Sequence, residues 1–208
     1  MCPFAAFFQR EAGPSLRLFD FPRKMLTGAP APCPADPEEE PALSQVEDFR
    51  HALRRLGAAV TIVATLDRDG RPRGLMMTAV MSLSFEPPSM LLAINRSASA
   101  LPALLEHGRF SINLIGAGEE EACRNFAAAD SESRFQADHW EEHPDRVPIY
   151  RNATATIICD VGDVQTFGTH AIVRGLVRST RYTHSTDCLV YLDGRFCRTA
   201  AGDALQLP

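Results

Sequence analysis

Residues 74–99, with the sequence GLMMTAVMSLSFEPPSMLLAINRSAS, decide the fold of this chain. The stretch predicts two short apolar strands separated by Pro87-Pro88 and closed by the loop Asn95-Arg96-Ser97-Ala98-Ser99. Small hydroxyl residues stand between the apolar positions: Thr78, Ser82 and Ser84. Small side chains let a flat ring approach backbone N–H groups, and a serine-rich loop with one guanidinium suits a phosphate. The stretch therefore favours a pocket for a flat, polar-edged ring that carries a phosphate tail.

The sequence on either side predicts further short strands and a few helices. Ser44 and Glu47 have the spacing of a capping box, and Gly57 is a stop signal, so a helix is expected over 44–56. Helices are also expected over 101–107 and 119–128, and a loop-rich segment over 130–150. Strands are expected over 58–66, 72–82, 89–94, 109–115, 154–165, 169–179 and 189–192, with a hairpin turn at 67–70. Many short antiparallel strands indicate a mainly β protein built on a closed barrel with helical additions.

The first 44 residues differ in composition from the rest. Gly28 to Ala42 contains five prolines and three consecutive glutamates. Such a segment buries too little apolar surface to offset the entropy of ordering it. We expect a Pro-rich, flexible N-terminal extension over 1–44 and one folded domain over 45–208.

Charge and cysteine usage exclude several classes of function. The net charge of the 208-residue chain is −5 and no basic stripe is visible, which argues against nucleic acid or an anionic membrane as a partner. No apolar run approaches the ~18 residues of a membrane span. The six cysteines form no CxxC pair, which is typical of reduced thiols in the cytoplasm.

Five pieces of the sequence, in order between Val46 and Arg198, resemble the flavin reductase family, the small reductase partners of two-component flavin-dependent monooxygenases. The residues 74–88 match its flavin-cradling segment. The other four pieces are FRHALRRLGAAVTIVAT at 49–65, RNFA at 124–127, GTH at 168–170 and YLDGRF at 191–196. One departure is Met76, because family members often carry Thr or Ala two residues after the glycine.

The resemblance implies a fold, an activity and partners. The fold is the split β-barrel of FMN-binding proteins, with a few short helices. The activity is reduction of FMN, or FAD, by NADH or NADPH through hydride transfer, with the reduced flavin passed to a partner monooxygenase. A homodimer is implied as well. Two alternatives are a non-catalytic flavin-binding module and a reductase of a non-flavin acceptor, such as a corrinoid or a ferric complex.

The same resemblance assigns the site residues. Backbone N–H groups near Thr78, Ala79 and Val80 face the edge of the ring, and Ser82 and Ser84 reach its carbonyls or the ribityl chain. The flavin-cradling segment contributes Gly74, Met76, Met77, Thr78, Ala79, Val80, Ser82 and Ser84. The phosphate loop contributes Asn95, Arg96, Ser97 and Ser99, although a plain polar loop capping the next helix fits these residues too.

Two further residues complete the predicted site. Phe126 lies near the flavin in the family, whereas an aromatic residue late in a helix is more commonly part of the core. His170 corresponds to the family histidine that positions the nicotinamide. On a strand it shares a face with Ile172 and Arg174, while Ala171, Val173 and Val177 face the other way. The alternative for His170 is a half-exposed histidine at the end of a strand.

Two motifs carry no further function. His139 to His143 has the letters HxxEH of a zinc peptidase, but Pro144 follows directly and argues against the long helix that this chemistry needs. We expect no metal, and expect Trp140 to close a loop over the barrel or the dimer. Gly116-Ala117-Gly118 is followed by three glutamates that would repel a pyrophosphate, so the nicotinamide cofactor is expected to bind without a Rossmann domain.

Overall fold

The computed structural model describes residues 43–131, 133–135 and 138–199, so the predicted extension over 1–44 lies almost wholly outside the described residues. The chain divides into two units, Met1–Val46 and Glu47–Pro208. None of the described helices is long and apolar enough to cross a membrane.

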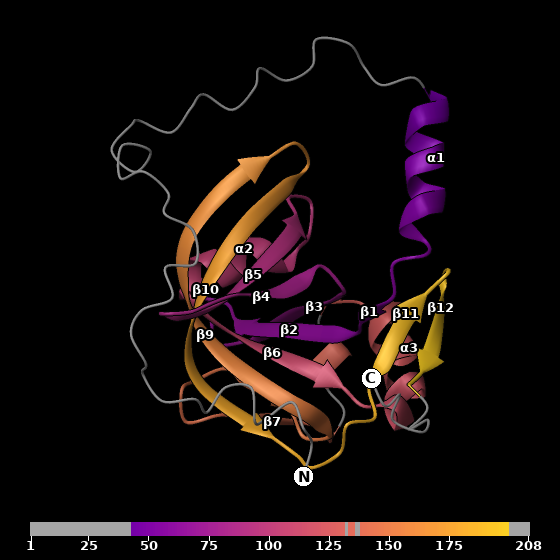
Figure 1. The fold of residues 1–208 in the computed structure, drawn as a ribbon. Coiled ribbons are helices and arrows are strands. Elements are labelled where there is room, and N and C mark those ends of the chain that lie inside the picture. The colour runs from indigo at the N-terminus through magenta and orange to yellow at the C-terminus, as the bar shows by residue number, and fades with distance from the viewer. Residues whose placement is uncertain (1–42, 132, 136–137, 200–208) are drawn as a thin grey trace, which may run out of the picture. The chain divides into compact units, whose positions relative to one another are not determined.

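Seven antiparallel strands form the main sheet, in the order β3-β2-β6-β9-β10-β5-β4 (Figure 1). They are β2 (Thr61–Leu66), β3 (Pro72–Met77), β4 (Val80–Phe85), β5 (Pro88–Asn95), β6 (Arg109–Ile115), β9 (Ala153–Phe167) and β10 (His170–Tyr182). The two edge strands, β3 and β4, follow one another in the chain with only Thr78-Ala79 between them. Three residue steps span at most about 11 Å, so the sheet has to curl until its edges approach. The result is a barrel that stays open between β3 and β4.

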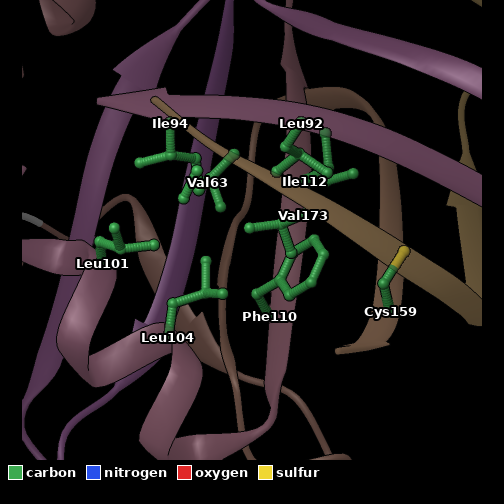
Figure 2. Packing of buried hydrophobic residues seen from close by; sticks show 10 residues of the cluster. Val63, Leu92, Ile94, Leu101, Leu104, Phe110, Ile112, Cys159 and Val173 are labelled. Carbon is green, nitrogen blue, oxygen red and sulfur yellow. The ribbon is translucent and has the colours of Figure 1, made fainter. Parts of the chain in front are cut away.

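One end of this barrel is closed by α2 (Ala100–His107), which supplies Leu101 and Leu104 to the core. Figure 2 shows these side chains converging with residues from both halves of the sheet. The buried cluster comprises Val63, Leu92, Ile94, Leu101, Leu104, Phe110, Ile112, Cys159, Ala171 and Val173. Gly175 lacks a side chain for a steric reason, because a Cβ there would stand 2.6 Å from Cζ of Phe110. Helix α2 ends at Gly108, whose φ of 74° lies in the left-handed region.

A second apolar cluster lies on the other face of β2. Its side chains come from strands of the main sheet, from α3 (Glu120–Ala128), from the 3-10 helix η4 (Ser133–Phe135), and from the hairpin of β7 (Trp140–Glu142) and β8 (Pro148–Tyr150). Its buried members are Val60, Ile62, Ile115, Cys123, Phe126, Tyr150, Ala153 and Leu189. The alternation along β2, with Ile62 in this cluster and Val63 in the barrel, explains why all six residues of β2 are buried.

A small sheet of β1 (Ala58–Ala59), β11 (Leu189–Leu192) and β12 (Arg195–Arg198) adjoins the barrel. Val60 connects the two sheets, because its N–H donates to the carbonyl of Leu189 and its own carbonyl accepts from Ile115. The sequence patterns did not predict strand β12. The signal for it was the Asp193-Gly194 pair, which adopts positive φ angles of 50° and 79° in a hairpin turn.

The class of fold is confirmed, and several boundaries need correction. Helix α1 runs from Leu43 to Leu53, so Ser44 lies inside the helix and is not its N-cap. Hydrogen-bonded turns follow the helix as far as Leu56, whose N–H donates to the carbonyl of Leu53. The strand expected over 72–82 is two strands, because β3 pairs with β2 whereas β4 pairs with β5. The reason is the barrel's corner, where the chain leaves one edge of the sheet and joins the other.

The segment expected to be loop-rich contains the β7–β8 hairpin. Trp140 to Glu142 is a strand, so His139 and His143 do not lie one helical turn apart. Among the described residues, no three His, Cys, Asp or Glu side chains are grouped so as to hold a metal ion.

Candidate functional site

The corner between β3 and β4 exposes backbone groups of residues 74–88, the segment predicted to cradle a flavin. The carbonyl of Ala79 accepts from the N–H of Ala93 on β5, at 3.0 Å, and the N–H of Val80 donates to Thr78, at 2.9 Å. In an antiparallel ladder, successive residues present their N–H groups to opposite sides. Because Ala79 faces β5, the N–H of Ser82 points to the open edge of the barrel. This edge can therefore donate to an acceptor that lies along it.

The two predicted serines of β4 differ in their surroundings. The hydroxyl of Ser84 donates to the carbonyl of Glu86 at 3.1 Å and accepts from the N–H of the same residue at 3.0 Å, within the turn before Pro87. The hydroxyl of Ser84 is thus used to shape the chain, whereas Ser82 is exposed at the open edge.

The loop from Asn95 to Ser99 is a compact polar turn. Oδ1 of Asn95 accepts from the N–H of Ser97, at 2.9 Å, and from its hydroxyl, at 2.8 Å. Asn95, Arg96, Ser97 and Ser99 are all exposed. Ser99 is the N-cap residue of α2, yet its side chain makes no capping hydrogen bond. The loop contains no acidic residue and one guanidinium, so its donors fit a phosphate.

His170 lies beside this loop. It is the first residue of β10 and pairs with Asn95 of β5, while the N–H of Arg96 donates to the carbonyl of Thr169 at 2.9 Å. The predicted face of β10 is confirmed, since Ala171 and Val173 are buried in the barrel and His170 is exposed on the other side. The Oγ1 of Thr169 lies 2.9 Å from Nδ1 of the imidazole, a contact that orients the ring.

The structure thus brings together three predicted elements that are far apart in the sequence. Val80 pairs with Leu92, three residues before Asn95, and Asn95 pairs with His170. The corner, the Asn95 loop and His170 therefore lie across three neighbouring strands, each about 4.8 Å from the next. A ring at the corner and a phosphate at the loop would lie within reach of the imidazole.

Other predicted residues lie elsewhere. Gly74 is buried in β3, and a Cβ there would stand 2.7 Å from the carbonyl oxygen of Val63 and 2.8 Å from the ring of Phe135. Phe126 is 6% exposed and contacts Phe135 with ring centroids 5.6 Å apart. Met76 packs against the same cluster, whereas the next residue, Met77, packs against the barrel core. Flavin contacts of these four residues stay predictions.

Two residues near His170, Thr169 and Phe167, were not among the site residues predicted from the sequence. Thr169 belongs to the GTH motif, and a hydroxyl directly before the histidine was the sequence feature that could have indicated its contact with the imidazole. Phe167 pairs with His170 across the β9–β10 hairpin and is 62% exposed, which makes it a flat apolar neighbour of the imidazole. The signal for Phe167 was a large apolar residue placed directly before the turn glycine, Gly168, where solvent exposure is expected.

Comparisons with known proteins identify the family of this chain. The family model of the flavin reductase like domain matches residues 53–200. The FMN reductase (NADH) RutF of Pseudomonas syringae pv. syringae (strain B728a) is 35% identical over 156 residues, which cover 74% of this chain and 86% of that protein. The 4-hydroxyphenylacetate 3-monooxygenase reductase component of Salmonella typhimurium is 32% identical over 151 residues, or 71% of this chain and 88% of that protein.

A solved structure shows the same architecture. The flavin reductase domain protein from Arthrobacter sp. FB24 superposes with a TM-score of 0.69 at 28% identity, covering 76% of this chain and 98% of that one. The open barrel, the match over 53–200 and these relatives lead to one conclusion: the chain belongs to the flavin reductase like domain family.

Proposed function

We propose that this protein is an NADH:flavin oxidoreductase that reduces FMN. The observation that carries the proposal is the meeting of the Asn95 loop, the Thr78-Ala79 corner and His170 at one end of the sheet. The FMN reductase activity of the relative from Pseudomonas supports the same substrate pair. Bound flavin supplies the ring that accepts a hydride, and the nicotinamide supplies the hydride.

The residues of this chain bind and orient the two reactants. Ser97, Ser99 and Arg96 hold the phosphate through hydroxyl, N–H and guanidinium donors. The N–H of Ser82 donates to the edge of the ring, where negative charge collects on reduction. The imidazole of His170, oriented by Thr169, packs beside the nicotinamide and holds it at attack distance.

The reduced flavin leaves for a partner monooxygenase in this proposal. The support is the relative from Salmonella, a monooxygenase reductase component that covers 71% of this chain. The proposal also places the protein in the cytoplasm, on the ground that the four described cysteines are free thiols.

We propose a homodimer as well. Edge strand β4 exposes Met81 at 59% and Phe85 at 81%, and Leu176 of β10 is 36% exposed. Large apolar side chains gathered on one sheet favour an interface.

The paired substitution Met81→Glu and Phe85→Glu is expected to give a monomer in light scattering. Leu105→Glu on α2, a similar change at a residue 40% exposed, is the control and leaves a dimer. A dimer in both variants contradicts this interface.

Steady-state NADH oxidation, measured at varied FMN concentration, tests the activity. Saturable dependence on added FMN is expected if flavin is a substrate that enters and leaves. His170→Ala is expected to lower turnover at least tenfold while FMN affinity stays unchanged, and His184→Ala, at an exposed histidine, is the control. A protein that holds flavin tightly and oxidises NADH no faster with added FMN overturns the proposal and favours a flavin-binding module.

A further inference from the structure

A cavity of about 180 Å³ lies under helix α3, away from the Asn95 loop and His170. We propose that this cavity, called the aromatic cavity below, binds the ring of a small aromatic carboxylate. Its walls include Phe126, Arg134, Trp140, Tyr150 and Ala122. Of the residues assigned above, Phe126 lines it, whereas those assigned to the phosphate or the nicotinamide do not. The inference does not depend on the proposed reductase activity.

The walls of the aromatic cavity are flat rings. Phe126 and Trp140 have centroids 5.8 Å apart, and Trp140 meets Tyr150 edge to face, with centroids 5.3 Å apart and planes at 71°. Aromatic rings prefer stacked or edge-to-face neighbours, worth about 0.5–1.5 kcal/mol beyond their area. Such walls favour a planar guest over an aliphatic guest of the same volume.

The volume of the aromatic cavity limits the guest to one ring. An apolar cavity of about 150 Å³ is known to accept benzene, whereas pockets for drug-sized ligands begin near 300 Å³. At about 180 Å³, the cavity fits one substituted six-membered ring. The three fused rings of a flavin exceed this volume, so a flavin cannot occupy the aromatic cavity whole, although Phe126 in its wall is also a predicted flavin contact.

The charge at the wall selects an anion. Nε of Arg134 donates to the carbonyl of Ala129 and Nη1 donates to the carbonyl of Gly74, each at 3.1 Å. The guanidinium carbon lies 5.4 Å from the centroid of Phe126. Carbonyl groups satisfy N–H donors without cancelling the positive charge, so Arg134 keeps a charge that a carboxylate can neutralise.

Tyr150 contributes a neutral polar group to the wall. The hydroxyl of Tyr150 donates to Oε2 of Glu119 at 2.5 Å, and the carboxylate of Glu119 also accepts from Asn152. Burial and this hydrogen bond hold the pKa of Tyr150 well above its usual range, so the phenol stays neutral. Glu119 does not line the aromatic cavity, whereas the exposed His139 does.

Trp140 makes the test direct. It is the only tryptophan of the chain, so fluorescence excited at the red edge of tryptophan absorption reports the aromatic cavity alone. Benzoate is titrated into the flavin-free, full-length protein without NADH, and a saturable change in fluorescence is expected. Cyclohexanecarboxylate, with the same charge and no flat ring, and benzyl alcohol, with the ring and no charge, are each expected to bind at least tenfold more weakly.

Three variants assign the signal to the cavity. Ala122→Leu fills the cavity from helix α3 and is expected to abolish the response. Ala127→Leu, at an exposed position of the same helix, is the matched control and keeps the wild-type affinity. Arg134→Gln retains donors for the two carbonyls without the charge and is expected to weaken benzoate at least tenfold, with an unchanged melting temperature as the check on folding.

Several results overturn the inference. They are the absence of a saturable response to benzoate in the wild type, an unaltered affinity in Ala122→Leu, and equal affinities for benzoate and cyclohexanecarboxylate. Displacement of benzoate by saturating FMN overturns the claim that the aromatic cavity is a site of its own. Because no step of the assay involves turnover, failure here leaves the proposed reductase activity standing, and loss of that activity leaves this site standing.

Discussion

The amide side chain of Asn113 is fully buried. We expect the substitution Asn113→Ala to lower markedly the denaturant concentration at which the protein unfolds. Its Nδ2 donates to the carbonyl of Ile62 at 3.0 Å and to the hydroxyl of Ser111 at 2.9 Å. Its Oδ1 accepts from the N–H of Tyr150 at 2.9 Å and from the hydroxyl of Thr156 at 3.2 Å. This one side chain therefore connects β2, β6, β8 and β9 at the boundary between the two apolar clusters.

The magnitude follows from the groups that Asn113→Ala leaves without partners. The buried N–H of Tyr150 loses its acceptor, which costs about 1–3 kcal/mol. The hydroxyl of Thr156 loses its acceptor as well, at the lower end of that range because it can rotate. Adding the truncated side chain, we expect the free energy of unfolding to fall by about 3 kcal/mol. For a domain of this size, the melting temperature should fall by about 6–12 °C.

Urea unfolding followed by tryptophan fluorescence, without flavin, measures the effect, because a bound ligand would add its own stabilisation. Asn152→Ala is the matched control. Asn152 is exposed, and within the described part of the chain its Nδ2 donates to Glu119 alone, at 3.2 Å. That variant should lose less than about 0.5 kcal/mol. A loss below about 1 kcal/mol in Asn113→Ala, or equal losses in both variants, would refute the assignment of Asn113 as the buried link between the clusters.

Three further outcomes are expected. Gly175→Val places a side chain against the ring of Phe110, 2.6 Å from the new Cβ. The free energy of unfolding measured in urea should fall by at least about 1–3 kcal/mol, and an unchanged value would contradict this steric clash. The hydrogen bond from Arg178 holds the pKa of Asp145 below its usual 3.8, so the folded state binds fewer protons than the unfolded state just below that pH. Stability should therefore fall as the pH drops through this range, less steeply in Arg178→Gln; parallel pH profiles would contradict this. Burial raises the pKa of Cys159 to about 12, so this thiol should not be alkylated at neutral pH. Mass spectrometry should instead find alkylation at the partly exposed Cys188 and Cys197.

Much of the fold follows from local sequence patterns. The Asp67 to Gly70 turn and the break at Pro87-Pro88 have strong local signals. The face of β10 that carries His170 follows from the two-residue period of a strand, and the structure confirms it. Family membership also follows from local pieces, since five short motifs in order are enough to indicate it.

Helix and strand ends were less accurate for a physical reason. Ser44 and Glu47 match a capping box, yet α1 begins at Leu43. No local signal marks the break at Thr78-Ala79, because the residues on both sides favour a strand. The break exists because β3 and β4 pair with different strands, and pairing is a long-range interaction.

The sequence alone predicted which residue types form the candidate site: a polar loop with one guanidinium, a corner of small residues, and a histidine on the exposed face of a strand. Only the tertiary structure decided which of them meet. The β4–β5–β10 register places the corner, Asn95 and His170 together, whereas Met76 on β3 and Phe126 on α3 pack in the second apolar cluster. Gly74 on β3 lies against Phe135 of that cluster. The physical reason is that a strand's two faces are set by its period, but its neighbours are set by how the whole sheet curls to bury its core.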